Sequence, residues 1–231
     1  MRNVLLAAAL ASSLGCGGRG RDDDGDDLRE APCRSAEGTV IIENSLDLDD
    51  LADVCELNGT MSIAGLSLTA VHLPRLTRLK GSISITGNEA LATVEAPHLT
   101  SISGALVVNG NLSMTSLSLP VLADVSGDLR VTNNPTLQTF EAPSLESVGG
   151  DLIVSSDGSM SYRDMSFLVF PLLKRIDGDI VITDNPALAK IRMTGLEVVT
   201  GTIAIADNPA LLSCAGSRIV DEGDCATASA K

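Results

Sequence analysis

The eleven residues Gly178-Asp-Ile-Val-Ile-Thr-Asp-Asn-Pro-Ala-Leu188 return with small changes along most of the chain. The other copies begin at Gly38, Gly59, Gly81, Gly104, Gly127, Gly150 and Gly201. Successive copies are 21, 22, 23, 23, 23, 28 and 23 residues apart. A nearly fixed period in this range is typical of a solenoid, in which each repeat buries its apolar face by stacking on its neighbours.

Each copy alternates in hydropathy directly after its glycine. The second and fourth residues are aliphatic in every copy, as in Ile180 and Ile182. This period of two predicts a strand with one face turned into the core. The seventh residue is polar in the six clearest copies, and we expect its side chains to stack as a ladder along the rod. The ladder residues are Asn88, Asn111, Asn134, Asp157, Asn185 and Asn208.

Corner residues complete each coil. Proline follows the ladder position in three copies, and five copies have a second proline seven residues before the glycine. Since proline ends a strand, each coil divides into three short apolar segments. A further apolar residue stands ten positions after the glycine, and in the sixth copy it is Met160. The pattern predicts an all-β fold, a three-sided, right-handed β-solenoid of about eight coils of ~23 residues with no helix between the strands.

The composition limits the possible functions. A chain of 231 residues suits one domain with appendages. Aromatic residues make up 2% of the chain, which fits a narrow core of aliphatic rows better than a sugar-stacking cleft. The formal net charge of −14 argues against nucleic acid as a partner, because phosphate binding needs a basic face.

Residues 1–16 have the features of an export signal. Arg2 precedes a short apolar run that is too short to span a bilayer, and the segment ends in Gly15 and Cys16. It resembles a bacterial lipoprotein signal, which implies that Cys16 is lipidated and becomes the mature N-terminus. The chain would then be held by its lipid at a membrane of the bacterial cell envelope, with the outer membrane or the cell surface favoured. The alternative is an ordinary signal peptide that is cleaved nearby.

Residues 17–32 form an acidic segment with almost no apolar side chains, which predicts a flexible tether. The run Asp22–Asp27 offers carboxylates to Ca²⁺, but it lacks the spacing of an EF-hand loop. We therefore interpret it as a solvated linker. Residues 226–231 are expected to be a C-terminal tail.

The cysteines other than Cys16 lie in two pairs at opposite ends of the repeat region. Cys33 and Cys55 bracket the first coil, and Cys214 and Cys225 bracket the last. This distance predicts one disulfide at each end, which agrees with export to an oxidising compartment. A metal or redox site is the alternative, but there is no CxxC motif.

Residues 33–225 resemble the receptor L-domain, the leucine-rich β-helical module of the insulin and epidermal growth factor receptors. The resemblance rests on Cys33, on the recurring pattern Leu-x-x-Val-x-Gly-x-Leu-x-Ile and on the Asn-rich corner that follows it. Its most specific piece is Leu173-Lys-Arg-Ile-Asp-Gly-Asp-Ile-Val-Ile182. The resemblance implies a β-helical fold and a ligand-binding role, and it names no ligand.

One predicted outward face combines charged and apolar residues. The first and third residues after successive glycines provide an acidic column beside a largely apolar one. The candidate residues for a partner surface are Asp128, Arg130, Asp151, Ile153, Asp179 and Val181. The plainer interpretation is that β-branched residues favour strands whichever way they face. A polysaccharide-acting β-helix enzyme would also use stacked acids, but it needs basic or aromatic groups to hold the sugar, and the outward neighbours here are Val107, Arg130, Ile153 and Val181.

The 28-residue copy is the one clear break in the period. Its five extra residues are assigned between Met160 and Phe167, where Tyr162, Phe167 and Phe170 are also found. Because loops on rigid scaffolds often carry function, Tyr162 and Phe167 join the candidate partner surface. An insertion without a function is equally compatible with the sequence.

No nucleophile motif, phosphate-binding loop or zinc-ligand spacing is present in the sequence. We therefore expect no enzyme activity and no cofactor. The sequence predicts a binding or adhesion module that presents a flat face to a protein or a glycan. The alternative is a structural spacer of the envelope with no specific ligand.

Overall fold

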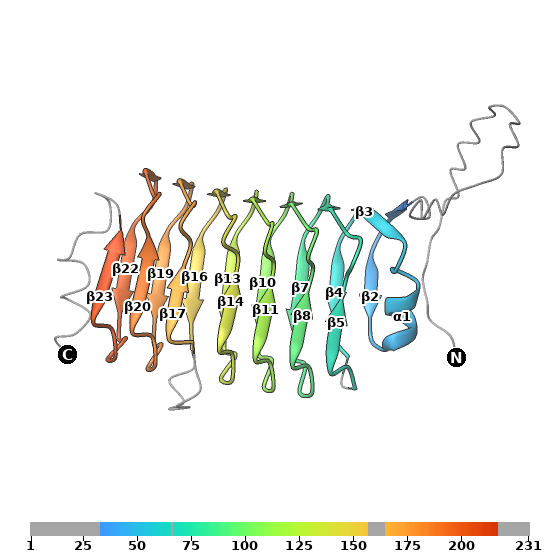
Figure 1. The fold of residues 1–231 in the computed structure, drawn as a ribbon, viewed down its shortest axis with the longest axis horizontal. Coiled ribbons are helices and arrows are strands. Elements are labelled where there is room, and N and C mark those ends of the chain that lie inside the picture. The colour runs from blue at the N-terminus through green and yellow to red at the C-terminus, as the bar shows by residue number, and fades with distance from the viewer. Residues whose placement is uncertain (1–32, 66, 157–164, 217–231) are drawn as a thin grey trace, which may run out of the picture.

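The chain folds as a nearly all-β solenoid, a rod of stacked coils (Figure 1). The computed structural model describes residues 33–65, 67–156 and 165–216, with side chains described as far as residue 212. Two long sheets contain eight strands each, so that seven steps separate the first coil from the last. This architecture confirms the predicted β-solenoid.

Sheets A and B form two sides of the rod. Sheet A contains β1 (Arg34–Glu37), β3 (Val54–Asn58), β6 (Arg78–Leu79), β9 (Ser101–Ile102), β12 (Asp124–Val125), β15 (Ser147–Val148), β18 (Arg175–Ile176) and β21 (Val198–Val199). Sheet B contains β2 (Val40–Ile42), β4 (Met61–Ile63), β7 (Ile83–Thr86), β10 (Leu106–Asn109), β13 (Leu129–Thr132), β16 (Leu152–Ser155), β19 (Ile180–Thr183) and β22 (Ile203–Ala206).

The third side is divided into two shorter sheets. Sheet C contains β5 (Ala70–His72), β8 (Thr93–Glu95), β11 (Ser116–Ser118) and β14 (Thr139–Glu141). Sheet D contains β17 (Phe167–Val169), β20 (Lys190–Met193) and β23 (Ser213–Gly216). In all four sheets each strand pairs in parallel with its equivalent in the next coil, so that equivalent residues form rows along the rod.

The first coil has a helix in place of a third-side strand, which the sequence did not predict. The helix α1 (Ser45–Asp49) lies between β2 and β3 at the N-terminal end of the rod (Figure 1). A capping box starts it: Oδ1 of Asn44 accepts from the N–H of Leu46 at 2.9 Å, and Oδ2 of Asp47 accepts from the N–H of Asn44 at 3.1 Å. Leu48 packs partly buried against the core, so α1 covers part of the open end.

Rows of aliphatic side chains fill the rod. The second and fourth residues after each glycine point inward, and Ile85, Val108 and Ile182 are fully buried. The core has room for one aromatic pair, in which the rings of Phe140 and Phe170 meet edge to face with centroids 5.5 Å apart.

From Gly81 onward, the repeated glycine is required by close contact between coils rather than by its backbone angle. At Gly201 an added Cβ would lie 2.5 Å from the carbonyl oxygen of Gly178 and 2.3 Å from Oδ1 of Asp179. Its φ lies outside the left-handed region. Any side chain there would therefore push consecutive coils apart.

The predicted asparagine ladder is present and buried. Oδ1 of Asn111 accepts from Nδ2 of Asn88 at 2.8 Å, and Oδ1 of Asn134 accepts from Nδ2 of Asn111 at 2.9 Å. Nδ2 of Asn185 donates in the same way to Oδ1 of Asn208 at 3.0 Å. Asp157, the predicted ladder residue of the sixth coil, lies outside the described residues. The ladder satisfies corner backbone groups in a place that water does not reach.

The insertion falls earlier than the sequence indicated. Met165 is buried and Phe167 pairs with Lys190, so Met165 takes the core position equivalent to Leu188. The assignment of Met160 to that position was wrong, because Met165 occupies it. The extra residues therefore come before this core position in the chain and not after it. Sheet C ends and sheet D begins at this insertion.

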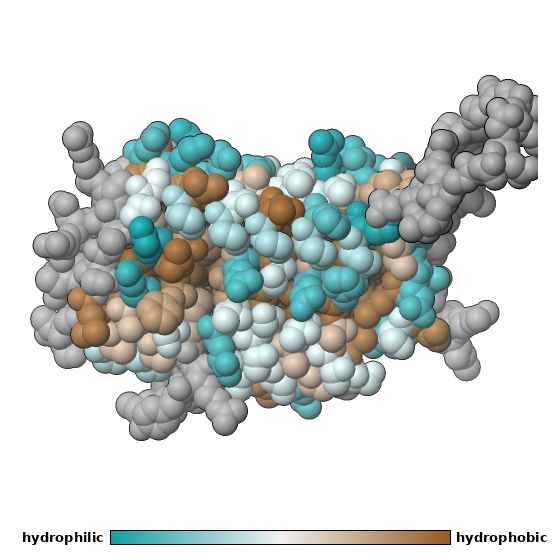
Figure 2. Space-filling model, in the orientation of Figure 1, coloured by the Kyte–Doolittle hydropathy of each residue, from teal (hydrophilic) through white to brown (hydrophobic). Residues whose placement is uncertain are grey.

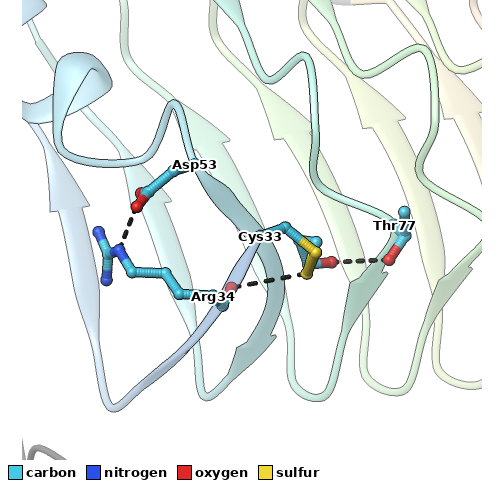
Figure 3. Close-up of a disulfide and its surroundings, with 5 residues drawn as sticks. Cys33, Arg34, Asp53 and Thr77 are labelled. Atoms are coloured by element: carbon cyan, nitrogen blue, oxygen red, sulfur yellow. Dashed lines mark hydrogen bonds and ion pairs between the residues drawn. A yellow bond between two sulfur atoms is a disulfide. The ribbon is translucent and has the colours of Figure 1, made fainter. Parts of the chain in front are cut away.

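A disulfide closes the N-terminal end of the rod (Figure 3). Cys33 and Cys55 are bonded, with their Cα atoms 5.5 Å apart, which confirms the predicted pair. Nε of Arg34 donates to Oδ1 of Asp53 at 2.8 Å, and the hydroxyl of Thr77 donates to the carbonyl of Cys55 at 2.7 Å. The predicted Cys214–Cys225 bond lies outside the residues whose side chains the structure describes.

Candidate functional site

The predicted acidic column joins consecutive coils. Oδ1 of Asp128 accepts from the N–H of Asp151 at 2.9 Å, and Oδ1 of Asp151 accepts from the N–H of Asp179 at 2.9 Å. Oδ1 of Asp179 accepts from the N–H of Thr202 at 2.6 Å. These backbone hydrogen bonds lower the pKa of Asp128 and of Asp179, because they stabilise the ionised carboxylate. Much of the hydrogen-bonding capacity of this column is therefore used within the rod.

Arg130 is held by the same column. Its Nη2 lies 2.7 Å from Oδ2 of Asp128 and 3.5 Å from Oδ2 of Asp151. The structure thus brings three of the candidate residues into one ion-pair cluster at the surface of sheet B. A partner would have to compete with both carboxylates for this guanidinium.

The predicted apolar column on sheet B is present but modest. Arg130, Ile153 and Val181 are register partners on β13, β16 and β19, and their side chains are half-buried. Beyond them the row continues into the small Ala204. Little apolar surface is left for a partner on this side.

Phe167 lies on another side of the rod. It belongs to β17 in sheet D, where its side chain is 60% exposed. Phe170 is buried and belongs to the core, although the sequence placed it with Phe167 in an aromatic group. Tyr162 lies outside the described residues. The candidate residues of sheet B and Phe167 therefore do not share one face.

Sheet D carries a different surface, which we name the β17–β20 surface and define by Phe167, Val169, Lys190 and Arg192. Phe167 pairs with Lys190 and Val169 pairs with Arg192, so two apolar side chains stand directly beside two cations. Val169 is 37% exposed, and Leu172 is exposed at the following corner. Hydrophobic and hydrophilic residues likewise adjoin near the C-terminal end of the rod in Figure 2.

The two cations of this surface have no acidic partner among the described residues. The side chains of Lys190 and Arg192 form no ion pair and no hydrogen bond with another residue in the described part of the chain. Elsewhere a lysine usually meets an acid in the preceding coil: Nζ of Lys174, for example, lies 2.7 Å from Oε2 of Glu146. In the coil before Lys190 and Arg192, the register partners are Phe167 and Val169.

Sequence reasoning missed Val169, Lys190 and Arg192. A signal was available, because Phe-Leu-Val and Lys-Ile-Arg each place a buried aliphatic residue between two outward ones. These residues lie in the third segment of the coil, whereas the acidic and apolar columns that drew attention in the sequence lie in the strand after the glycine.

Within the described residues, the interior has no cavity large enough for an ordinary small-molecule ligand. The two best-formed cavities in the described part of the chain have volumes of about 20 and 10 Å³, against the roughly 300–1,000 Å³ of ordinary ligand pockets. Within residues 33–65, 67–156 and 165–216, no three His, Cys, Asp or Glu side chains are grouped to hold a metal ion. No helix in the same ranges has the length and apolar character to cross a membrane.

Comparisons with protein family models, with curated proteins and with solved structures find no match to this chain.

Proposed function

We propose that the chain is a non-catalytic binding module and that the β17–β20 surface is its contact surface. One observation carries the proposal: exposed Phe167 and Val169 stand beside Lys190 and Arg192, and neither cation has an acidic partner among the described residues. Aromatic and cationic side chains that lose water together supply much of the energy of protein interfaces. A rigid solenoid holds them in place with little loss of entropy on binding.

The location that we propose is the bacterial cell envelope. Residues 1–16 would serve as a lipoprotein signal, Cys16 would carry the lipid, and residues 17–32 would tether the rod to the membrane, with the outer membrane or the cell surface favoured. The bond between Cys33 and Cys55 supports export, since such bonds persist in oxidising compartments. A second bond between Cys214 and Cys225 is part of the proposal.

The resemblance of the repeat to the receptor L-domain supports a binding role. That module also presents the flat sides of a leucine-rich β-helix. Because the interior has no sizeable cavity in the described ranges, we favour a protein or a glycan that contacts a surface. The β17–β20 surface has one exposed aromatic residue, Phe167, which favours a protein over a glycan.

A structural spacer is the second candidate function. It is favoured by the side-chain ladders, in which Asn88 to Asn134 and Asp128 to Asp179 bond from coil to coil. Such ladders stiffen a rod whether or not it has a ligand. A spacer would tolerate any soluble substitution on the β17–β20 surface.

Titration of the labelled chain onto envelope vesicles from the producing cells separates the two functions. We expect saturable binding that is lost when Phe167→Asp and Val169→Asp are combined. The matched control combines Ala70→Asp and Thr93→Asp on β5 and β8 of sheet C, farther along the rod, and it should bind as the wild type does. Unsaturable binding, or equal binding by both variants, would leave the spacer as the function.

A further inference from the structure

The third side of the rod has a self-complementary pattern of charge. Glu141 on β14 lies one coil before β17, and Arg192 on β20 lies one coil after it. Phe167 and Val169 stand between them. We propose that a second copy of this chain docks here in the opposite orientation, with a two-fold axis along β17. The inference rests on the proposed function, since it names the partner of the β17–β20 surface.

The charges at both ends of the pattern are available. Glu141 and Arg192 are exposed, and neither is in an ion pair within the described residues. Among the described residues, the carboxylate of Glu141 accepts only a long hydrogen bond of 3.3 Å, from the hydroxyl of Ser118. An exposed acid and an exposed base without partners, equally far from an apolar centre, are what an isologous interface uses.

The symmetry brings these groups together. The two-fold axis runs parallel to β17 and lies between the two facing surfaces. A half-turn about it preserves the strand direction and reverses the direction of the rod, so β20 of one copy faces β14 of the other. Phe167 and Val169 then meet their own equivalents at the axis. Arg192 faces Glu141 of the second copy, and the contact occurs twice. Facing sheets lie about 10 Å apart, a gap that an arginine and a glutamate side chain bridge together.

Lys190 adds to the same contact. It occupies the row of Phe167, so the half-turn places it opposite Thr139 and diagonal to Glu141 of the second copy. Each Glu141 would then face two cations, and each pair of cations one carboxylate. In this arrangement the exposed cations of the β17–β20 surface, Lys190 and Arg192, would both have an acidic partner.

The contact area predicts a weak dimer. The overlap runs over about five strands at ~4.8 Å spacing and is three or four residues wide, which amounts to a few hundred Å² per copy. Stable dimers usually bury roughly 800 Å² per copy. A weak interface of this size is enough to hold two chains together when they are concentrated at membrane surfaces. Because the two rods of a pair run in opposite directions, the pair would connect two opposing membrane surfaces.

Other anionic partners fit the pattern less well. An acidic peptide or an anionic lipid surface would satisfy Lys190 and Arg192, but it would be repelled by Glu141 in the same row. The net charge of −14 further opposes adsorption to anionic lipid. A second copy accounts for the acid, the apolar pair and the bases together.

Charge exchange between copies tests the proposal. The full chain is studied in density-matched detergent by sedimentation equilibrium, with wild type, Arg192→Glu and Glu141→Arg. Each variant alone places like charges opposite each other twice, so the dimer dissociation constant should rise at least about tenfold. In an equimolar mixture of the two variants both contacts pair opposite charges, and association should return to within about threefold of the wild type.

A matched control and a lipid arm complete the test. Arg78→Glu changes the charge equally at an exposed position of sheet A, and it should associate as the wild type does. The proposal is overturned if the wild type stays monomeric at the highest soluble concentration, or if the mixture associates no better than the single variants. It is also overturned if monomeric wild type binds phosphatidylglycerol vesicles and loses this binding with Arg192→Glu.

Binding to envelope vesicles distinguishes a failure of the self-association proposal from a failure of the proposed binding function. Vesicles from cells that lack the chain should not bind it if the partner is a second copy. Saturable, Phe167-dependent binding to such vesicles would refute self-association and would leave the binding module in place.

Discussion

Sheets C and D lie on the same side of the rod and differ in what their outward side chains contact. On sheet C, Nδ1 of His72 lies 3.4 Å from Oε2 of Glu95, and the hydroxyl of Thr139 donates to Oγ of Ser116 at 3.0 Å. On sheet D, the outward residues Phe167, Val169, Lys190 and Arg192 form no ion pair with a described residue.

Both sheets cover a row of buried apolar side chains. Leu117 of β11 and Leu168 of β17 are both fully buried. A solenoid is stabilised row by row, so each row of surface residues can change without altering the core. Several outward side chains of sheet C bond to one another along the rod, whereas the four outward side chains of sheet D named above form no ion pair with a described residue.

The largest expected effect is on the free energy of unfolding, and it tests whether the core is packed equally well behind sheet C and behind sheet D. Leu117→Ala and Leu168→Ala should each lower the free energy of unfolding by about 2–5 kcal/mol, because each leaves a cavity in a packed row. Denaturant unfolding followed by circular dichroism measures both. If Leu168→Ala cost less than half of what Leu117→Ala costs, sheet D would be loosely packed and the halves would differ inside as well.

The ladder provides the next test. Asn111 lies in the half with sheet C and Asn208 in the half with sheet D, and both are fully buried. Replacing either by Ala leaves buried partners unsatisfied, as with the carbonyl of Ile85 for Asn111 and that of Ile182 for Asn208. We expect a loss of about 1–3 kcal/mol in each case from denaturant unfolding. The half-exposed Asn109→Ala is the control, and a loss as large as that of Asn111→Ala would contradict the special role of the ladder.

Acid should weaken the rod through the aspartate column. The folded-state pKa of Asp128 lies below its unfolded value, mainly because of the hydrogen bond from the N–H of Asp151. Its contribution is therefore complete above the unfolded pKa and is lost as the pH falls through the folded value. The side chain is 33% exposed, so solvent screening limits the contribution to about 1 kcal/mol. The stability difference between wild type and Asp128→Asn should shrink between pH 6 and pH 3, roughly the range in which carboxylates titrate.

A difference that stayed constant over this range would show that the ionised carboxylate adds nothing to stability. Asp179→Asn, in the half with sheet D, should behave in the same direction, because the N–H of Thr202 lowers the pKa of Asp179. The column would then act alike in both halves.

The smallest effect on stability is expected at the surface itself. Combining Phe167→Thr with Val169→Glu gives β17 the outward residues of β14 and places a carboxylate beside Arg192. Stability should change by no more than about 0.5 kcal/mol in thermal unfolding, since both side chains face solvent. Binding to envelope vesicles should nevertheless be lost. Retained binding would show that the difference between sheets C and D has no functional meaning.

The corner before the ladder shows how a physical requirement was met by different residues. Asn133, Asp184 and Asp207 have φ values of 54°, 59° and 55°, and Gly87 and Gly110 occupy the equivalent positions with φ of 66° and 67°. Gly, Asn and Asp are the residues that adopt the left-handed region most easily. The repeated Gly-Asn, Asn-Asn and Asp-Asn pairs were visible in the sequence, but their common conformation was not recognised.

The sequence alone determined the repeat, the inward rows, the asparagine ladder and the Cys33–Cys55 bond. These features follow from local periodicity, because a residue that recurs once per coil must stack on its equivalent in the next coil. The helix α1 was missed because it interrupts the period in the first coil, where the pattern is weakest.

Only the tertiary structure decided which outward residues are free. Asp128 and Arg130 looked available in the sequence, but they bond to the next coil and to each other. The side chains of Lys190 and Arg192 have no partner within the described part of the chain, because Phe167 and Val169 precede them in register. Contacts between rows depend on where the insertion falls, and Met165 showed that it falls before the core position rather than after it. The physical reason is that periodicity specifies which residues face outward, whereas the neighbours of a side chain depend on the register of coils that are 21 to 28 residues apart.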